Sequence, residues 1–384
     1  MLTNNQVELF QLAIPERDIQ DLKDRLNRTR WPNKEPVSDW SQGVPLANIQ
    51  ALCEYWRSSY DWRRCERMLN GFGQYRTTID GLGIHFLHIR SPEPNALPLL
   101  MTHGWPGSVV EFHKVIGPLT NPVAYGGQAR DAFHLVLPSL PGHGFSDQPA
   151  EVGWNIDRVT NAWIELMQRL GYGKRWAAQG GDWGELVVMT LGNKAPQGLI
   201  GLHASTLDIT PTAEETANAS PKERTYLAQA QRYRDDLSGY ATQQTTRPQT
   251  LGYALADSPA GQAAWIYEKF HDWTDNQGTP ESVLTRDELL DNIMLYWLPD
   301  AGASSARFYW ENAEVVWGNL PVAVPLAISL FPKDQTGSSR RWAERRFSNL
   351  VYWNELERGG HFGAFEQPVL FTREIRAGFR QIRA

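Results

Sequence analysis

Cysteine is scarce in this sequence, since only Cys53 and Cys65 occur among its 384 residues. The two stand twelve positions apart in helix-like sequence, with no CxxC motif and no nearby pair of histidines. A disulfide framework or a zinc site is therefore not expected, and this cysteine usage fits a reducing cytoplasm.

Long apolar runs and runs of basic residues are also missing. Neither the N-terminal MLTNNQVELFQLAIPERDIQDLKDRL nor any later segment has an apolar stretch long enough for a signal peptide or a membrane span. We therefore expect a soluble, cytoplasmic protein without a membrane anchor. The formal net charge of −6 and the lack of any basic run of five or more argue against nucleic acid as a partner.

Tryptophan, in contrast, is abundant, with 16 copies between Trp31 and Trp353. These side chains fill a core or wall a large apolar pocket, and composition does not choose between the two. A hydrophobic content of 41% and a charged content of 21% are ordinary for a globular protein. The length predicts one large domain with substantial additional segments.

The spacing of apolar residues predicts an α/β fold. Helical spacing covers Pro15–Arg30 and about Leu46–Leu69, and Tyr75–Ile89 is typical of a hairpin. Short apolar runs separated by helical segments follow, and this alternation predicts a mostly parallel sheet with helices on both faces. The runs expected as strands are Leu97–Thr102, His134–Pro138, Trp176–Gln179, Leu199–Ala204, Leu326–Phe331 and Leu350–Trp353.

One interval interrupts the alternation of strands and helices. From roughly Leu207 to Gly318 the sequence is polar, helical and rich in Tyr and Trp, without an apolar strand run. An insertion of this length between two strands predicts a cap over the active-site edge of the sheet. We expect an N-terminal extension at 1–74, an α/β core at 75–206 and 321–384, and a helical cap at 207–320.

The segment Gln179–Glu185, QGGDWGE, has the pattern of a nucleophile elbow. Small residues stand two before and two after Asp182, between an apolar strand and the helix-like ELVVMTLGNKAP. A carboxylate at this position is ionised near neutral pH without a base and can attack a saturated carbon to form an ester. The alternative is that Asp182 only caps the following helix.

Two further residues complete a catalytic constellation. His361 stands in RGGHF after the last strand-like run, and Asp334 follows PLAISLFP. A carboxylate at Asp334 can accept from the His361 ring and fix its tautomer. Taken singly, His361 could be a loop histidine and Asp334 a turn residue. The chain order nucleophile, acid, histidine is that of α/β-hydrolases.

Donors for an oxyanion hole are expected at two backbone N–H groups. The turn HGWPG after Leu97–Thr102 can direct the N–H of Trp105 at the site, and Trp183 follows the nucleophile directly. Both tryptophans are also candidates for the substrate pocket, as is Phe145 in the turn PGHGFS. His103 is interpreted as a turn stabiliser.

Over nearly its whole length the sequence resembles epoxide hydrolases of the microsomal type, members of the α/β-hydrolase superfamily with a characteristic N-terminal extension. The motifs that carry the likeness are an RWP in the N-terminal helical region, HGWPGSVVEF, LPGHGFSDQP, QGGDWG, RPQTLGYALADSPAGQAAWIYEKF, ARFYWEN, FPKD and RGGHFGAFEQP.

The resemblance implies an epoxide hydrolase with Asp182 as nucleophile, His361 as base and Asp334 as the orienting acid, where some members have Glu. Water would cleave the Asp182 ester with the help of His361. The family needs no metal and no cofactor. The substrate would be a small-molecule epoxide, and the Trp-rich cap suggests a bulky or aromatic one. The sequence does not determine the oligomeric state, and a homodimer is compatible with it.

In the resembled family, two cap tyrosines bind the epoxide oxygen. One matches Tyr309 within RFYWEN, and the other matches Tyr240 in a looser motif, for which Tyr253 or Tyr267 could substitute. Either ring could instead pack under the cap.

Two other functions stay open. A haloalkane dehalogenase shares the Asp nucleophile, His base and acid, and a hydrolase-like scaffold can also serve as a non-catalytic binding protein. The tyrosine-bearing cap and the N-terminal extension argue against the first, and the filled catalytic positions against the second.

Overall fold

The computed structural model describes residues 6–315 and 320–383. Gly318, where the expected helical interval ends, lies outside the described residues. Within them the strands form one nine-stranded sheet in the order β1-β2-β3-β5-β4-β6-β7-β8-β9. The strand bounds are β1 Glu8–Leu9, β2 Gln74–Ile79, β3 Leu82–Ile89, β4 Leu97–Thr102, β5 Phe133–Pro138, β6 Trp176–Gly180, β7 Leu199–Ala204, β8 Leu326–Leu330 and β9 Leu350–Glu355.

The sheet confirms the expected hairpin and the six expected strands. Strands β1, β2 and β3 pair antiparallel, β3 also pairs antiparallel with β5, and all pairs from β5 to β9 are parallel. Strand β1 was not expected from the sequence, because two residues are too few to show an alternating pattern. The central strand β4 is buried along its full length, which is why it is a continuous apolar run.

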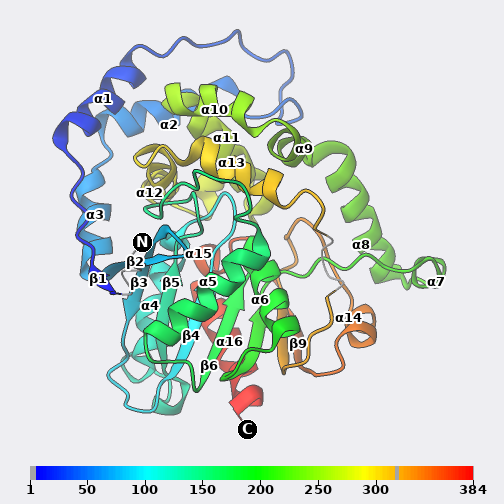
Figure 1. Cartoon of the computed structure of the whole chain (residues 1–384). Coiled ribbons are helices and arrows are strands. Elements are labelled where there is room, and N and C mark those ends of the chain that lie inside the picture. Colours follow the sequence, from blue (N-terminus) through cyan, green and yellow to red (C-terminus); the bar gives the residue numbers. More distant parts are fainter. Residues whose placement is uncertain (1–5, 316–319, 384) are drawn as a thin grey trace.

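Helices cover both faces of the sheet. Helices α5 and α6 lie against each other on one face, and α4 and α16 lie together on the other (Figure 1). The bounds of the core helices are α4 His113–Thr120, α5 Ile156–Arg169, α6 Trp183–Lys194, α14 Arg340–Arg346, α15 Gly363–Glu366 and α16 Pro368–Arg383, with short η1 Val109–Phe112, η2 Pro122–Tyr125 and η3 Ala129–Asp131.

The described residues between β7 and β8 form helices and connecting loops without a strand, as the sequence predicts. Figure 1 shows these helices as a layer stacked on one end of the sheet, with α8 reaching out to the side. Their bounds are α7 Ala213–Ala217, α8 Pro221–Arg232, the π-helical turn η4 Tyr233–Leu237, α9 Gly239–Thr246, α10 Pro248–Asp257, α11 Pro259–Trp273, η5 Pro280–Ser282, α12 Arg286–Trp297 and α13 Ala301–Glu311.

The N-terminal segment runs along the side of both layers (Figure 1). It contains α1 Glu16–Asn27, α2 Leu46–Ser58 and α3 Trp62–Gly71; α2 packs against α11 and α12. The single helix expected over Leu46–Leu69 is wrong, because α2 ends at Ser58. Asp61 caps α3 by accepting from the backbone N–H of Arg63, a side-chain bond that favours a new helix start.

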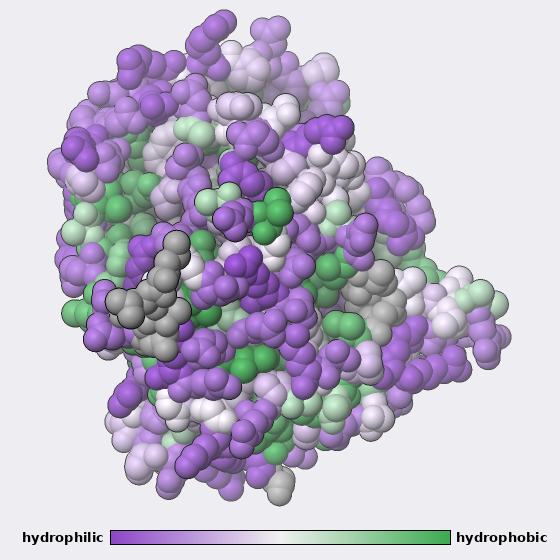
Figure 2. Space-filling model, viewed as in Figure 1, coloured by the Kyte–Doolittle hydropathy of each residue, from purple (hydrophilic) through white to green (hydrophobic). Residues whose placement is uncertain are grey.

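The molecular surface is mostly hydrophilic on the face that Figure 2 shows, with apolar residues in separate patches. Cys53 and Cys65 are buried and unpaired. Among the helices that the structure describes, none is both long and apolar enough to cross a membrane.

Candidate active site

Asp182 stands at the sharp turn between β6 and α6. Its φ of 53° lies in the left-handed region, which a non-glycine residue adopts only when the surroundings hold it there. The turn is tight because two glycines allow close approach. A Cβ on Gly180 would overlap the carbonyl of Gly184, and one on Gly184 would overlap the carbonyl of Thr102. The elbow expected from the sequence is therefore present.

A threonine that the sequence analysis did not identify supports this turn. The backbone N–H of Asp182 donates to Oγ1 of Thr206 at 3.0 Å. The Thr206 hydroxyl in turn donates to the buried carboxyl of Glu185 at 3.1 Å. Glu185 stands three residues after Asp182, on the first turn of α6. In the sequence, this spacing was the signal that could have indicated a side chain supporting the turn. Asp182 is not the side-chain cap of α6, which has no such hydrogen bond.

The loops after β8 and β9 bring the expected acid, Asp334, and the expected base, His361, together. Nδ1 of His361 donates to Oδ1 of Asp334 at 2.7 Å, and its Nε2 lies 3.4 Å from Oδ2 of Asp182. Asp334 also accepts from the backbone N–H of Gln335 at 2.7 Å. A parallel bridge between Lys333 and Gly360 joins the two loops. The three residues that the sequence places far apart thus form one hydrogen-bonded group.

The two carboxylates control the charge of His361. Burial by itself lowers the pKa of this imidazole, but Asp334 and Asp182 more than offset it and raise the pKa well above its ordinary value. The ring is therefore an imidazolium while both carboxylates are charged. Loss of either negative charge lowers the pKa of His361.

The expected oxyanion-hole donor at Trp105 contacts the side chain of Asp182. Its backbone N–H donates to Oδ1 of Asp182 at 2.9 Å, leaving Oδ2 for chemistry. Trp183, the other expected donor, is the first residue of α6 and directly follows Asp182. Its buried side chain lines the catalytic cavity.

Both tyrosines expected from the cap reach this site. The Tyr240 ring, from α9, stacks on Trp105 with centroids 5.0 Å apart. The Tyr309 ring, from α13, packs edge-on against Trp183 at 4.8 Å, and the two tyrosine rings are 5.9 Å apart. Burial raises the pKa of both phenols well above the ordinary value, so each keeps its proton and can donate a hydrogen bond.

A third tyrosine, which the sequence analysis missed, joins them. The hydroxyls of Tyr233 and Tyr240 are 2.9 Å apart, and Tyr233 lines the same cavity as Asp182 and His361. Tyr233 lies in η4 and Tyr240 in α9, and the chain leaves helical geometry at Ser238 between them, so no helical spacing in the sequence indicated this pair. The two substitutes considered for Tyr240 lie elsewhere. Tyr253 is 71% exposed, and the Tyr267 hydroxyl donates to Glu281 at 2.6 Å.

The catalytic cavity has a volume of about 270 Å³. Asp182, His361 and Asp334 line it from the core, and Tyr240 and Tyr309 line it from the helices above. The expected pocket role of Phe145 is wrong. Its ring packs instead against Phe10, at 5.8 Å, and His85, at 5.6 Å, because the N-terminal segment lies over this turn.

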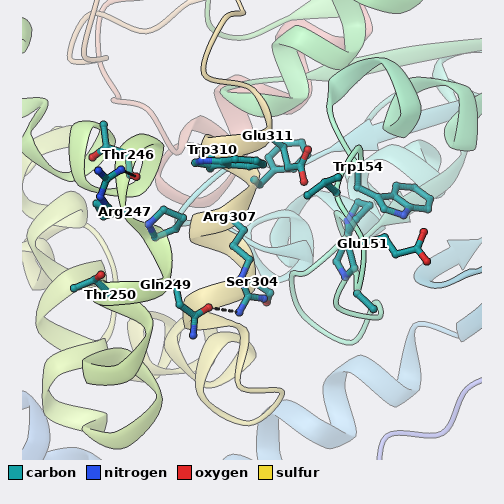
Figure 3. A pocket seen from close by; sticks show the side chains of 16 residues that line it. Glu151, Trp154, Thr246, Arg247, Gln249, Thr250, Ser304, Arg307, Trp310 and Glu311 are labelled. Carbon is teal, nitrogen blue, oxygen red and sulfur yellow. Dashed lines mark hydrogen bonds between the residues drawn. The ribbon is translucent and has the colours of Figure 1, made fainter.

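A larger cavity, of about 620 Å³, lies beside the catalytic one. Figure 3 shows it between the loop around Trp154 and helices α10 and α13, with Arg307 donating to Gln249 at 2.8 Å. Phe308 lines this cavity and packs edge-on against Trp183, with centroids 5.0 Å apart. None of the catalytic candidates lines it, so size does not identify the reactive site here.

Comparison with known proteins gives the same picture along the whole chain. Residues 7–112 match the family described as epoxide hydrolase N terminus, and residues 98–246 match the alpha/beta hydrolase fold. A putative epoxide hydrolase of Stigmatella aurantiaca is 59% identical over 98% of this chain and 85% of that protein. Epoxide hydrolase 1 of Sus scrofa is 33% identical over 97% of this chain and 88% of that protein.

Solved structures agree with the sequence relatives. The Aspergillus niger epoxide hydrolase superposes with a TM-score of 0.89 at 30% identity, covering 99% of this chain and 97% of that one. The juvenile hormone epoxide hydrolase of the silkworm Bombyx mori gives a TM-score of 0.89 at 29% identity, covering 99% and 96%. With this likeness in sequence and structure over nearly its full length, the chain belongs to the epoxide hydrolases.

Proposed function

We propose that this epoxide hydrolase forms a vicinal diol in two chemical steps, with Asp182 as the nucleophile. The observation that carries the proposal is the position of the Asp182 carboxylate. Trp105 holds Oδ1 by its backbone N–H at 2.9 Å, while Oδ2 is available in a cavity that two protonated tyrosines also line. A carboxylate fixed in this way is oriented for attack without reorganisation.

In the first step, Oδ2 of Asp182 attacks a ring carbon of the epoxide, and the carbon–oxygen bond of the ring breaks. Negative charge develops on the departing oxygen, which stays attached to the substrate. Tyr240 and Tyr309 donate hydrogen bonds to that oxygen and stabilise the charge in a buried site, where such bonds are strong. That oxygen takes a proton from one of the tyrosines, and the tyrosine regains a proton from the imidazolium of His361. The product is a neutral hydroxyalkyl ester of Asp182 beside a neutral His361.

In the second step, water cleaves the ester. His361 takes a proton from water, the water oxygen attacks Cγ of Asp182, and the backbone N–H groups of Trp105 and Trp183 stabilise the oxyanion. The tetrahedral intermediate collapses and expels the diol oxygen, which receives the proton from His361. The new carboxyl group then gives its remaining proton to His361, which restores the carboxylate and the imidazolium of the resting site. One oxygen from water stays in the Asp182 carboxylate, and the former carboxylate oxygen leaves in the diol.

The pKa of His361 fits this order of events. Before alkylation, Asp334 and Asp182 together raise that pKa, and the imidazolium is no base. Alkylation turns Asp182 into a neutral ester, so the pKa of His361 falls. The imidazole becomes a base at the stage that needs one.

We propose a compact epoxide with an aromatic or apolar substituent as the substrate. The cavity of about 270 Å³ is near the lower limit for small-molecule sites, and Trp183, Tyr240 and Tyr309 give it aromatic walls. A polycyclic epoxide would need the cavity to widen.

We further propose that the division of the chain into an extension at 1–74, a core at 75–206 and 321–384, and a cap at 207–320 corresponds to separate roles. The core supplies nucleophile, base and acid, and the cap supplies the tyrosines. Packing of α2 against α11 and α12 supports a role of the extension in holding the cap in place.

Neither alternative function has comparable support. The relatives and structures reported above are named epoxide hydrolases, and a halide leaving group needs no proton from a tyrosine.

The test is a diol-formation assay with aliphatic, styrene-type and polycyclic epoxides, with haloalkanes in parallel. We expect diol from the compact epoxides and no halide release. Halide release without diol would overturn the proposal.

A further inference from the structure

A second, smaller cavity adjoins the catalytic one. It has a volume of about 20 Å³ and is enclosed by the turn after β4, the end of β6 and the loop that carries His361. Among the residues that the structure describes, only Asp182 and His361 line both this chamber and the substrate cavity, and neither Tyr240 nor Tyr309 lines the chamber. The nucleophile and the base therefore separate two compartments.

The size and lining of the chamber suit one water molecule. A site needs roughly 10–15 Å³ and two to four polar partners to hold a water. The chamber provides the carboxyl of Glu111 and the side-chain amide of Gln179, besides Asp182 and His361. A ligand larger than water does not fit in this volume.

The acceptor oxygens of the two additional polar groups have no hydrogen-bond partner in the described residues. Gln179 is 1% exposed, and its Nε2 donates to Ser205 at 3.3 Å, but its buried Oε1 has no partner within 6–315 and 320–383. In the same ranges no hydrogen bond or ion pair involves the Glu111 carboxyl. A buried acceptor without a partner, such as Oε1 of Gln179, is costly unless a water or ligand satisfies it.

Glu111 is directed to the catalytic pair by its surroundings. A Cβ on Gly107 would overlap Oε2 of Glu111, so the carboxyl lies beside the Gly107 backbone, in the turn that also carries Trp105. Burial raises the pKa of Glu111 to about 8. The nearby His361 opposes this rise, whereas the charge of Asp182 adds to it. The protonation of Glu111 is therefore coupled electrostatically to Asp182 and His361. With this pKa the carboxyl is mostly protonated at neutral pH.

We infer that this chamber holds the hydrolytic water, positioned by Glu111 and Gln179 on the side of Asp182 away from the epoxide. The inference rests on the proposed two-step function. One O–H of the water points to Nε2 of His361, and the other needs an acceptor, which Oε1 of Gln179 and the carboxyl oxygen of Glu111 provide. The water oxygen then faces Cγ of Asp182 while the alkyl group occupies the other compartment, so substrate and water do not compete for space.

The experiment follows ester formation and ester decay separately, by rapid quenching and mass spectrometry of the intact protein in single turnovers. The variants are Glu111→Leu and Gln179→Leu, which remove one acceptor each, and Glu111→Gln, which keeps one. Glu165→Gln is the matched control, because Glu165 is 40% exposed and pairs with Arg169 on α5. If Glu111→Leu does not fold, the other two variants carry the test.

A misplaced water slows one step only. We expect ester decay about tenfold to a hundredfold slower in each Leu variant, with ester formation as in the parent, because poor positioning alone can cost about a hundredfold. Glu111→Gln should recover most of the loss, and Glu165→Gln should match the parent.

Three outcomes would overturn the inference: parent-like decay in both Leu variants, an equal slowing of both steps, or a Glu111→Gln variant as slow as Glu111→Leu. Absence of any ester in the parent would instead refute the proposed function itself.

Discussion

Nε2 of His361 lies 3.4 Å from Oδ2 of Asp182, so the proposed base faces the proposed nucleophile directly. The charge of one residue therefore sets the protonation of the other. In the resting enzyme this contact favours the imidazolium, and once Asp182 is alkylated the contact no longer opposes loss of the proton. The order of the two chemical steps follows from this one relationship.

The first prediction concerns the charge of His361. Asp182→Asn imitates the neutral ester, so the pKa of His361 should fall from its raised value; Asp334 remains in place. NMR titration of the imidazole in the parent and the variant measures this directly. An unchanged pKa would show that Asp182 does not control the base.

The same shift has a consequence for stability. Because the folded pKa of His361 is raised, the stabilisation by its imidazolium is complete below the unfolded value of about 6.5 and is lost as pH rises through the folded value. Asp182→Asn should weaken this pH dependence of the unfolding free energy. Chemical denaturation at several pH values checks it.

The second prediction is that His361→Ala stops after the first step. Alkylation by a carboxylate needs no base, but ester hydrolysis does. Mass spectrometry should show a stable adduct on the variant, and the double variant with Asp182→Asn should show none. Asp334→Asn should be milder or similar, since Asp334 orients the ring and raises its pKa but does not itself react with the substrate. Full diol turnover by His361→Ala would contradict the assignment.

The third prediction separates the tyrosines from the rest of the site. Tyr309→Phe and Tyr240→Phe should each slow ester formation by about 10²–10³, the typical loss for one oxyanion donor, and leave ester decay nearly unchanged. Tyr253→Phe is the control, because this side chain is 71% exposed. Rapid-mixing kinetics of the three variants test the roles. Parent-like alkylation in both buried-tyrosine variants would exclude them as oxygen ligands.

The fourth prediction tests the elbow itself. Gly184→Ala places a Cβ against the carbonyl of Thr102 and should destabilise the fold by about 1–3 kcal/mol, with loss of activity. Gly71→Ala, near the end of α3 in open space, should be neutral or slightly stabilising. Denaturant unfolding of both variants provides the comparison. Equal stability of the two would mean that the turn tolerates a side chain at Gly184.

The sequence was sufficient for the parts of the site that follow strands. Asp182, Asp334, His361 and Trp105 all lie just after apolar runs, and the carboxyl ends of parallel strands meet at one edge of a sheet. Periodicity and turn residues therefore place them together. Tyr309 and Tyr240 came from motif resemblance, and the structure places both in the cavity.

The rest depends on contacts between distant segments, which no local pattern contains. Phe145 was expected in the pocket but packs against Phe10, because the path of the N-terminal segment is set by tertiary packing. Tyr233 and Gln179 gave no signal of their own, since their position matters only once the cap and β6 are in place. The helix break before Asp61 arises because the Asp61 side chain caps a new helix in competition with continuation of the preceding one. The spacing of apolar residues alone does not show which of the two is more stable.

The most direct test of the covalent mechanism is a single turnover in heavy-oxygen water with enzyme in excess over epoxide. If Asp182 forms the ester, the first diol carries an oxygen from the protein and no label, and the label appears in the Asp182 carboxylate by peptide mass spectrometry. A first diol that carries the label, with an unlabelled Asp182, would mean that water attacks the epoxide directly, and it would contradict the account.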